Sequence, residues 1–231
     1  MIKKRILWAD SLKGWLIILV IIGHAIQVLM GNACENNHVW NLIYSFHMPA
    51  FMAVSGWFAF KRPHGRIISA CKRRCYQVLV PYLVWSSLQW LISGCVLANL
   101  PLLITAPDTY FWFLWVIFWI CIIFISCQWI ADKYRIDELI LVGLTCVLLI
   151  GIMVRFEFRL FGFQFLSYYF LFYTLGYCIH RFEKIRLKNN CVIITFVILW
   201  TFLAWFWNMH ELPSCLSSIP YIPYALLQYA Y

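Results

Sequence analysis

The stretch Lys13-Gly14-Trp15-Leu16-Ile17-Ile18-Leu19-Val20-Ile21-Ile22-Gly23-His24 is almost wholly apolar between two ionisable ends. A helix turns about 100° and rises about 1.5 Å per residue, so Lys13 and His24 fall within about 20° of each other and about 16 Å apart along the axis. Asp10, one turn before Lys13, shares that face. Ionisable groups are costly inside a bilayer, and a spanning helix with such a face therefore predicts a functional site.

The composition is that of a protein that lives in lipid. Of the 231 residues, 64% are hydrophobic and only 12% are charged, and the mean hydropathy is +0.80. A soluble domain usually carries about 25% charged residues. The net charge of +9 lies in short basic clusters between apolar runs, which is typical of the loops of a multi-span protein. We therefore expect membrane lipids around the chain, and no nucleic acid partner.

Eight apolar segments predict an all-α, polytopic membrane helix bundle with about eight spans. They cover residues 14–31, 42–60, 78–98, 110–130, 138–154, 162–180, 191–207 and 216–231. The connections between these segments are short, which leaves no room for a separate soluble domain. Residues 1–231 are therefore expected to form a single integral membrane domain.

The positions of the basic residues predict an orientation. With eight spans, 16 of the 18 Lys and Arg residues fall on the side of the N-terminus, and only Arg155 and Arg159 fall on the other. Cytoplasmic loops carry an excess of Lys and Arg. We therefore expect a multi-pass protein whose N-terminus is cytoplasmic.

His24 is the first candidate for chemistry. A histidine within a membrane can act as a general base, a proton-relay member or a metal ligand. An isolated histidine is more often structural, hydrogen-bonded across helices to a serine or a carbonyl. Because Lys13 and Asp10 share its face and a second histidine, His47, enters the next helix at a similar depth, we favour a functional role.

His47 lies in Tyr44-Ser45-Phe46-His47-Met48-Pro49, where two interpretations stay open. Pro49 lacks an N–H and leaves the carbonyl of residue 45 without its usual helical partner, so His47 either satisfies freed backbone groups or lines a polar pocket with His24. No third ligand with suitable spacing accompanies the two histidines, and we expect no metal.

Arg73 and Arg74 precede the third apolar segment. The positive-inside rule alone accounts for arginines here. The other interpretation is a clamp for an anionic cytosolic ligand, because guanidinium groups match phosphate oxygens in shape and charge. Anionic lipid headgroups would be bound equally well.

Several of these residues recur together in a known family. The matching elements are Asp10-x-x-Lys13-Gly14, Gly23-His24, Phe46-His47-Met48-Pro49 with Ser55-Gly56, Arg74 before Pro81-Tyr82, Trp112-Phe113-Leu114, and the stretch 171–176. In this pattern the chain resembles the acyltransferase-3 family of integral membrane acyltransferases. The match is most specific in the N-terminal third, where the basic residue, the gap and the histidine occur together.

The resemblance implies transfer of an acyl group, most often acetyl, from acyl-CoA to a carbohydrate hydroxyl of a surface polysaccharide or glycolipid. It implies a catalytic role for His24, with Lys13 as its paired basic residue and Arg74 as the arginine at the entry of the third helix. Gln77 stands where the family often has a second basic residue, and Arg73 is the candidate to replace it. Eight spans make this chain either a shortened member of a family with usually about ten, or one that lacks two C-terminal helices.

The chemistry of such a transfer fits the residues. Acyl-CoA is a cytosolic anion and serves as a co-substrate, so no permanently bound cofactor is expected. The expected binding residues are Asp10, Lys13, Arg73, Arg74 and His47. His24 is the expected base or acyl carrier, and we expect its apolar surroundings to keep it unprotonated. The bacterial cytoplasmic (inner) membrane is the expected location, with a glycan or lipid-linked glycan as the acceptor.

Two other functions remain open from the sequence. A transporter or flippase could use His24 and His47 as a proton relay, since buried ionisable groups also suit transport. The chain shows no inverted repeat, which argues against this interpretation. A non-catalytic membrane scaffold with structural histidines is the second alternative.

Overall fold

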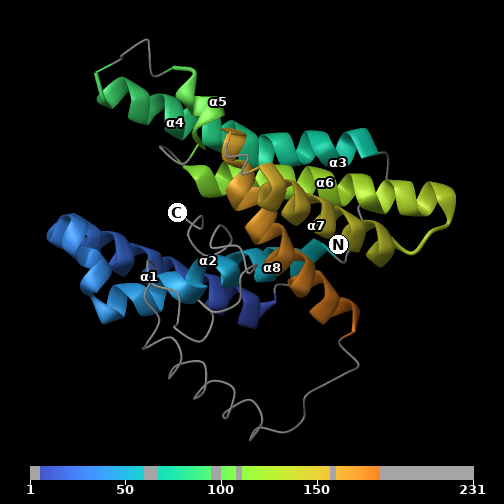
Figure 1. Cartoon of the computed structure of the whole chain (residues 1–231), viewed down its shortest axis with the longest axis horizontal. Helices are drawn as coiled ribbons and strands as arrows, with labels where there is room; N and C mark the ends of the chain where they lie inside the picture. Colours follow the sequence, from blue (N-terminus) through green and yellow to red (C-terminus); the bar gives the residue numbers. More distant parts are fainter. Residues whose placement is uncertain (1–5, 60–66, 95–99, 108–110, 157–159, 183–231) are drawn as a thin grey trace, which may run out of the picture. The chain divides into compact units, whose positions relative to one another are not determined.

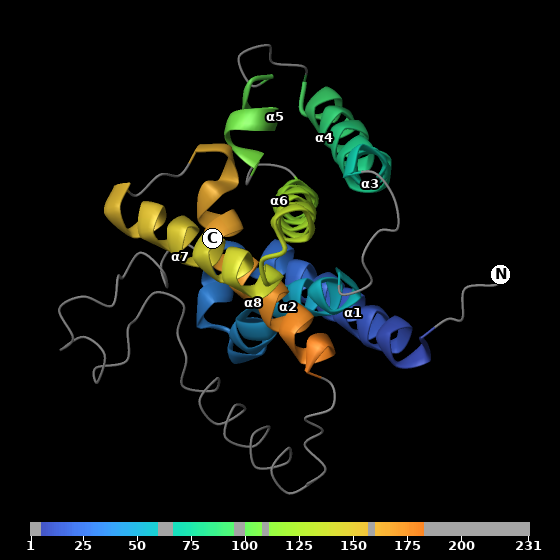
Figure 2. The same cartoon turned by 90° about the vertical axis from the view of Figure 1, so that its right-hand side faces the viewer.

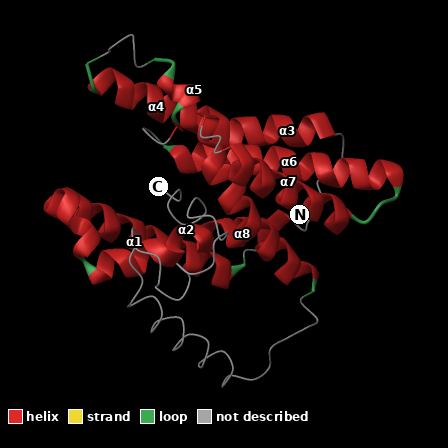
Figure 3. Cartoon of the chain, in the orientation of Figure 1, coloured by secondary structure: helices red, strands yellow, loops and turns green. Residues whose placement is uncertain are grey.

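The computed structural model describes residues 6–59, 67–94, 100–107, 111–156 and 160–182. Every regular element in these ranges is helical, and none is a strand (Figure 3). The predicted all-α class is confirmed.

The elements follow one another as Figure 1 labels them. They are α1 (Leu7–Met30), η1 (Gly31–Asn36), α2 (His38–Ala59), α3 (Ile67–Arg74), the π-helical turn η2 (Cys75–Leu79), α4 (Val80–Ile92), α5 (Leu102–Thr105), α6 (Trp112–Tyr134), α7 (Glu138–Phe156), η5 (Leu160–Gly162) and α8 (Phe163–Arg181).

Three of the described helices are long and apolar enough to cross a membrane. They are α1, α6 and α7, with 24, 23 and 19 residues. α2 and α8 occupy two further predicted segments, 42–60 and 162–180, and are 22 and 19 residues long. The predicted segments 191–207 and 216–231 lie outside the described residues, and the total of eight spans stays a prediction.

The helix that carries the third predicted segment, 78–98, begins well before that segment. In the structure α3, η2 and α4 follow one another without a break, so the helical stretch already begins at Ile67. The sequence placed the boundary where the hydropathy rises, but basic residues are good helix formers and leave no break in the backbone. Lys72, Arg73 and Arg74 are consequently helical residues rather than loop residues.

The chain divides into two compact units, and the expectation of one domain stays a prediction. Among the described residues, unit 1 holds α1, η1, α2 and the end of α8 from Leu175, and unit 2 holds the elements from α3 to Thr174 of α8.

Unit 1 is built on α1 and α2, which lie side by side in Figures 1 and 2. Trp8, near the start of α1, packs edge-on against Trp57, near the end of α2, with ring centroids 5.0 Å apart. The two helices are therefore antiparallel. His180, at the end of α8, also contacts Trp57, so the start of α1 and the ends of α2 and α8 meet at one end of this unit.

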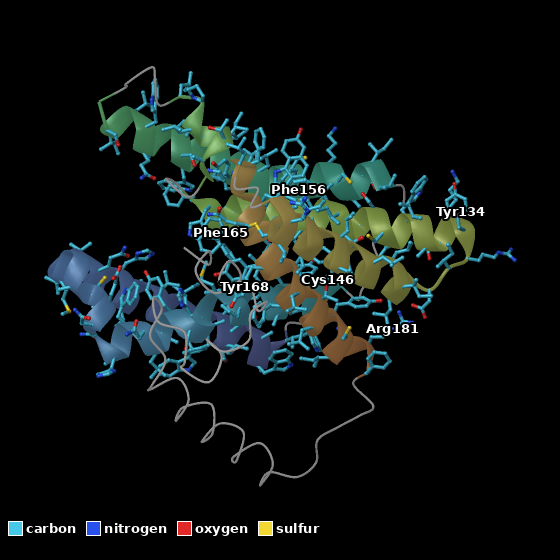
Figure 4. All side chains as sticks on the ribbon, in the orientation of Figure 1. Tyr134, Cys146, Phe156, Phe165, Tyr168 and Arg181 are labelled. Atoms are coloured by element: carbon cyan, nitrogen blue, oxygen red, sulfur yellow. The ribbon has the colours of Figure 1, made fainter. Side chains whose placement is uncertain are left out.

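In unit 2, α6 packs against α3, η2 and α7 and buries residues along most of its length. Two aromatic rings of α8 pack against it: Phe165 stacks on Trp112, and Tyr173 lies edge-on against Phe124. In Figure 4 Phe165 lies toward one end of α6, and Tyr134 marks the other end of this helix. This packing fixes the levels of α6 and α8 relative to one another.

Gly176 allows α8 to touch the backbone of α2. A Cβ atom at this position would lie 1.8 Å from the carbonyl oxygen of Ala53 and 2.5 Å from its carbonyl carbon. Backbone atoms within a helix have little freedom to move away, so only glycine fits here.

We therefore expect Gly176→Ala to destabilise the protein by about 1–3 kcal/mol, which is the usual cost of overpacking. Thermal unfolding in detergent, followed by the loss of monodisperse protein, measures the effect. Gly143→Ala in α7 is the matched control, since a Cβ there meets nothing within 4 Å. Equal melting of the two variants would contradict the close contact.

Candidate functional site

The face of α1 that carries Lys13 and His24 lies beside the face that packs against α2. Ala9, Leu16 and Gly23 are the buried residues of this helix and form one stripe. Helical geometry places Lys13 and His24 roughly 60° and 80° from Leu16, in the same direction. Lys13 is half-buried, whereas Asp10 and His24 are exposed.

An aromatic ring holds the ammonium group of Lys13. The ammonium nitrogen lies 4.6 Å from the centroid of the Phe58 ring, an arrangement that attracts a cation to the electron-rich ring face. Phe58 is at the end of α2 beside Trp57. The Lys13 ammonium therefore lies at the end of unit 1 where the start of α1 meets the ends of α2 and α8. The ammonium and the His24 imidazole share a face of α1 at different levels.

Tyr44 of α2 connects the surroundings of His24 to His47. A Cβ on Gly23 would lie 2.8 Å from the Tyr44 ring, which therefore rests on α1 at the residue before His24. The Tyr44 hydroxyl donates a hydrogen bond of 3.2 Å to Gln27. Another neighbour of this ring is His47, at 4.9 Å between centroids.

His47 is buried, with 4% of its surface exposed. Its Nδ1 lies 2.7 Å from the Ile43 carbonyl oxygen. A carbonyl oxygen only accepts hydrogen bonds, so Nδ1 carries the proton, and in the neutral ring Nε2 is left with a lone pair. The carbonyl that His47 satisfies is thus that of Ile43 and not the one that Pro49 frees.

His24 and His47 lie on neighbouring helices of unit 1. A Cβ on Gly23, the residue before His24, would meet Tyr44 and Ile43 of α2, and His47 contacts both of these residues. Among the described residues His24 is exposed and His47 is buried, and the apolar enclosure expected for His24 stays a prediction. The result is a pair of imidazoles in which one is exposed and the other is buried with a fixed tautomer.

His180 was missed by the sequence analysis. Its Nδ1 donates a hydrogen bond of 2.6 Å to the Trp57 carbonyl oxygen, and its ring stacks on the Trp57 indole at 3.8 Å. Beside Arg181 this histidine has the sequence context of a loop charge, and no periodic signal marks it. It fastens the end of α8 to the end of α2.

The two predicted arginines behave differently. Arg73 is exposed, but Arg74 is half-buried, and its Nε atom is enclosed without a hydrogen-bond partner among the described residues. The Arg74 guanidinium lies within electrostatic range of Cys121 in α6 and Tyr173 in α8. Both of these residues are in unit 2, as Arg74 is.

Cys121 and Tyr173 form a buried polar contact that the sequence did not reveal. The Cys121 sulfur and the Tyr173 hydroxyl are 3.6 Å apart, and the two side chains are 4% and 2% exposed. Cys121 lies near the middle of α6, which packs against α3 and η2 on either side of Arg74. A cysteine and a tyrosine within apolar runs give no signal of their own in the sequence.

A model of the acyltransferase-3 family, described as an acyltransferase domain, matches residues 6–231. The nodulation protein NolL of Sinorhizobium fredii is 34% identical over 131 residues, which cover 50% of this chain and 34% of the relative. NolL of Mesorhizobium japonicum is 34% identical over 132 residues, with the same shares of the two chains. No solved structure matches this chain.

The match thus spans about a third of the length of the curated relatives. The family model, in contrast, covers nearly every residue of this chain, including His24, His47, Arg73 and Arg74. Together with the apolar helices, it marks a membrane protein. The chain belongs to the acyltransferase-3 family.

Proposed function

We propose that the protein is a membrane O-acyltransferase that moves an acyl group, specifically acetyl, from acyl-CoA to a carbohydrate hydroxyl of a surface polysaccharide or glycolipid. The observation that carries the proposal is the buried His47 with its fixed tautomer, on the helix that packs against the His24 helix in a member of an acyltransferase family. A thioester is already activated, so an enzyme mainly has to remove a proton from the hydroxyl and stabilise the charge that forms on the carbonyl oxygen.

His24 is the proposed base. His24 is exposed among the described residues of unit 1, and the acceptor hydroxyl is proposed to approach its imidazole there. As the hydroxyl oxygen attacks the thioester carbon, its proton passes to the imidazole. The C–S bond then breaks, and the thiolate of CoA takes up a proton. The alternative course is that His24 first accepts the acyl group itself and then passes it to the hydroxyl.

His47 supports this role through its fixed tautomer. Its proton on Nδ1 is engaged by the Ile43 carbonyl, so the ring presents only the Nε2 lone pair as an acceptor. A buried acceptor near His24 suits the onward transfer of a proton or the binding of the acceptor hydroxyl.

The proposed donor side is the cytoplasmic one, where acyl-CoA is found. Lys13, Arg73 and Arg74 are the proposed cations for the donor, and Asp10 lies beside Lys13 on the same face. The proposed location is the bacterial cytoplasmic membrane with a cytoplasmic N-terminus, which the distribution of basic residues supports.

Replacing His24 tests the proposal directly. We expect His24→Ala to lower acyl transfer by a factor of about 10²–10⁴, the usual contribution of a general base. Membranes that contain the full chain are incubated with labelled acetyl-CoA and candidate glycans, and ester-bound label is counted. His38→Ala, at the exposed start of α2, is the histidine control and should keep full activity. Undiminished transfer by the His24 variant at equal expression rejects the role.

Replacing His47 with Asn separates structure from chemistry. The Asn side-chain amide can still donate to the Ile43 carbonyl, but it offers no counterpart of the Nε2 lone pair. We expect His47→Asn to retain the melting temperature of the wild type and to lose transfer by about tenfold or more. If this variant is as active as the wild type, His47 has only a structural role.

The paired imidazoles also suit the runner-up function, a transporter or flippase with a proton relay. That function predicts proton movement into proteoliposomes without acyl-CoA, which a pH-sensitive dye inside the vesicles detects. It also predicts no deposition of label on glycans. His24-dependent ester formation in sealed membranes is the result that the acyltransferase alone explains.

A further inference from the structure

Arg74 carries an enclosed hydrogen-bond donor without an acceptor. Its Nε atom has almost no exposed surface and no partner among the described side chains and backbone groups. Leaving a charged donor unsatisfied away from water is expensive. The neighbouring Arg73 is exposed and bears no such cost. The difference points to a missing oxygen acceptor at Arg74 alone.

The surroundings of Arg74 supply a second polar group. The Tyr173 hydroxyl and the Cys121 sulfur lie 3.6 Å apart in the same unit, and α6, which carries Cys121, packs against both α3 and η2, the two elements that meet at Arg74. The Tyr173 ring is held edge-on by Phe124 at 5.2 Å, so its hydroxyl has a defined position. Thiols are weak hydrogen-bond partners. An oxygen atom from a ligand would be a better partner for both the tyrosine and the arginine.

The level of this site favours a neutral carbonyl over a phosphate. Cys121 lies near the middle of α6, and its neighbours on that helix include the buried Ile120 and Phe124. Moving a phosphate, with its multiple charge, to this level would cost far more free energy than moving a carbonyl group. Arg73 is exposed, and its long side chain can extend toward the membrane surface, so it is the better partner for the phosphates of CoA.

We propose that Arg74 and Tyr173 bind the thioester carbonyl oxygen of the acyl donor. The inference rests on the proposed function and adds Tyr173 to it. When the acceptor hydroxyl attacks, a C–O bond forms and the carbonyl electron pair moves onto this oxygen, where the two donors stabilise it. Collapse restores the carbonyl and expels the thiolate of CoA, which takes up the proton that the hydroxyl lost.

Two analogues of acetyl-CoA that do not react test this site on the full chain in detergent or nanodiscs. One is the ketone in which a methylene replaces the sulfur, which keeps the carbonyl. The other is S-ethyl-CoA, which keeps the sulfur and lacks the carbonyl. We expect the wild type to bind the ketone about tenfold more tightly than the thioether, the effect of a charge-assisted hydrogen bond.

Tyr173→Phe keeps the ring and removes only the hydroxyl. We expect Tyr173→Phe to lose most of the preference for the ketone. Arg74→Gln should lose it as well. The matched control, Arg73→Gln, is expected to weaken the binding of both analogues equally and to keep their ratio. Melting temperatures show which variants are folded, and Arg74→Lys offers a milder change if the glutamine variant does not fold.

The proposal is overturned if folded Tyr173→Phe retains the wild-type ratio of the two affinities. It is also overturned if Arg74→Gln weakens the binding of both analogues equally, which is the result expected for loss of a phosphate contact. It is also overturned if the wild type does not distinguish the two analogues. His24-dependent acyl transfer with an unchanged ratio in Tyr173→Phe leaves the acyltransferase in place and rejects only this site. Absence of both transfer and analogue binding in the wild type rejects the two together.

Discussion

A polar side chain enclosed by apolar helices must find a hydrogen-bond partner, and this requirement applies to His47 in unit 1 and, separately, to Arg74 in unit 2. At His47 the requirement is met within the protein, because the Ile43 carbonyl accepts the Nδ1 proton and thereby fixes the tautomer. At Arg74 it is not met, since the enclosed Nε has no acceptor among the described residues. The satisfied group can serve chemistry at its other nitrogen, whereas the unsatisfied group is suited to bind an oxygen.

In unit 1, α8 and α2 are in direct contact through their backbones. Gly176 lets α8 approach Ala53 of α2, and His180 then reaches the Trp57 carbonyl one turn further on. The start of α1 joins this group through Trp8. Because the ends of three helices are tied together by rings, an aromatic face is in place to hold the Lys13 ammonium at this end of the unit.

The sequence was sufficient for the helical class, the family and the face that carries Lys13 and His24, because these follow from hydropathy, helical period and motif spacing. It was also sufficient to place His47 on the helix next to that of His24, since α1 and α2 pack together. It could not distinguish Arg73 from Arg74, because hydropathy averages over neighbours and does not show which of two adjacent side chains turns inward. Tyr173, Cys121 and His180 were not predicted, since their roles depend on contacts with residues distant in the chain.

The π-helical turn Cys75–Leu79 directly follows Arg74. Such a turn holds one more residue than a regular helical turn and is frequent at functional sites. Without that extra residue, the helix after it would be rotated by about 100° relative to the helix before it. The basic residues of α3 and the apolar face of α4 could then not both be directed as they are now. The number of residues in this short segment therefore matters more than their identity. Replacing one apolar residue with another should be harmless, whereas deleting one residue should move the Arg74 guanidinium away from its surroundings in unit 2.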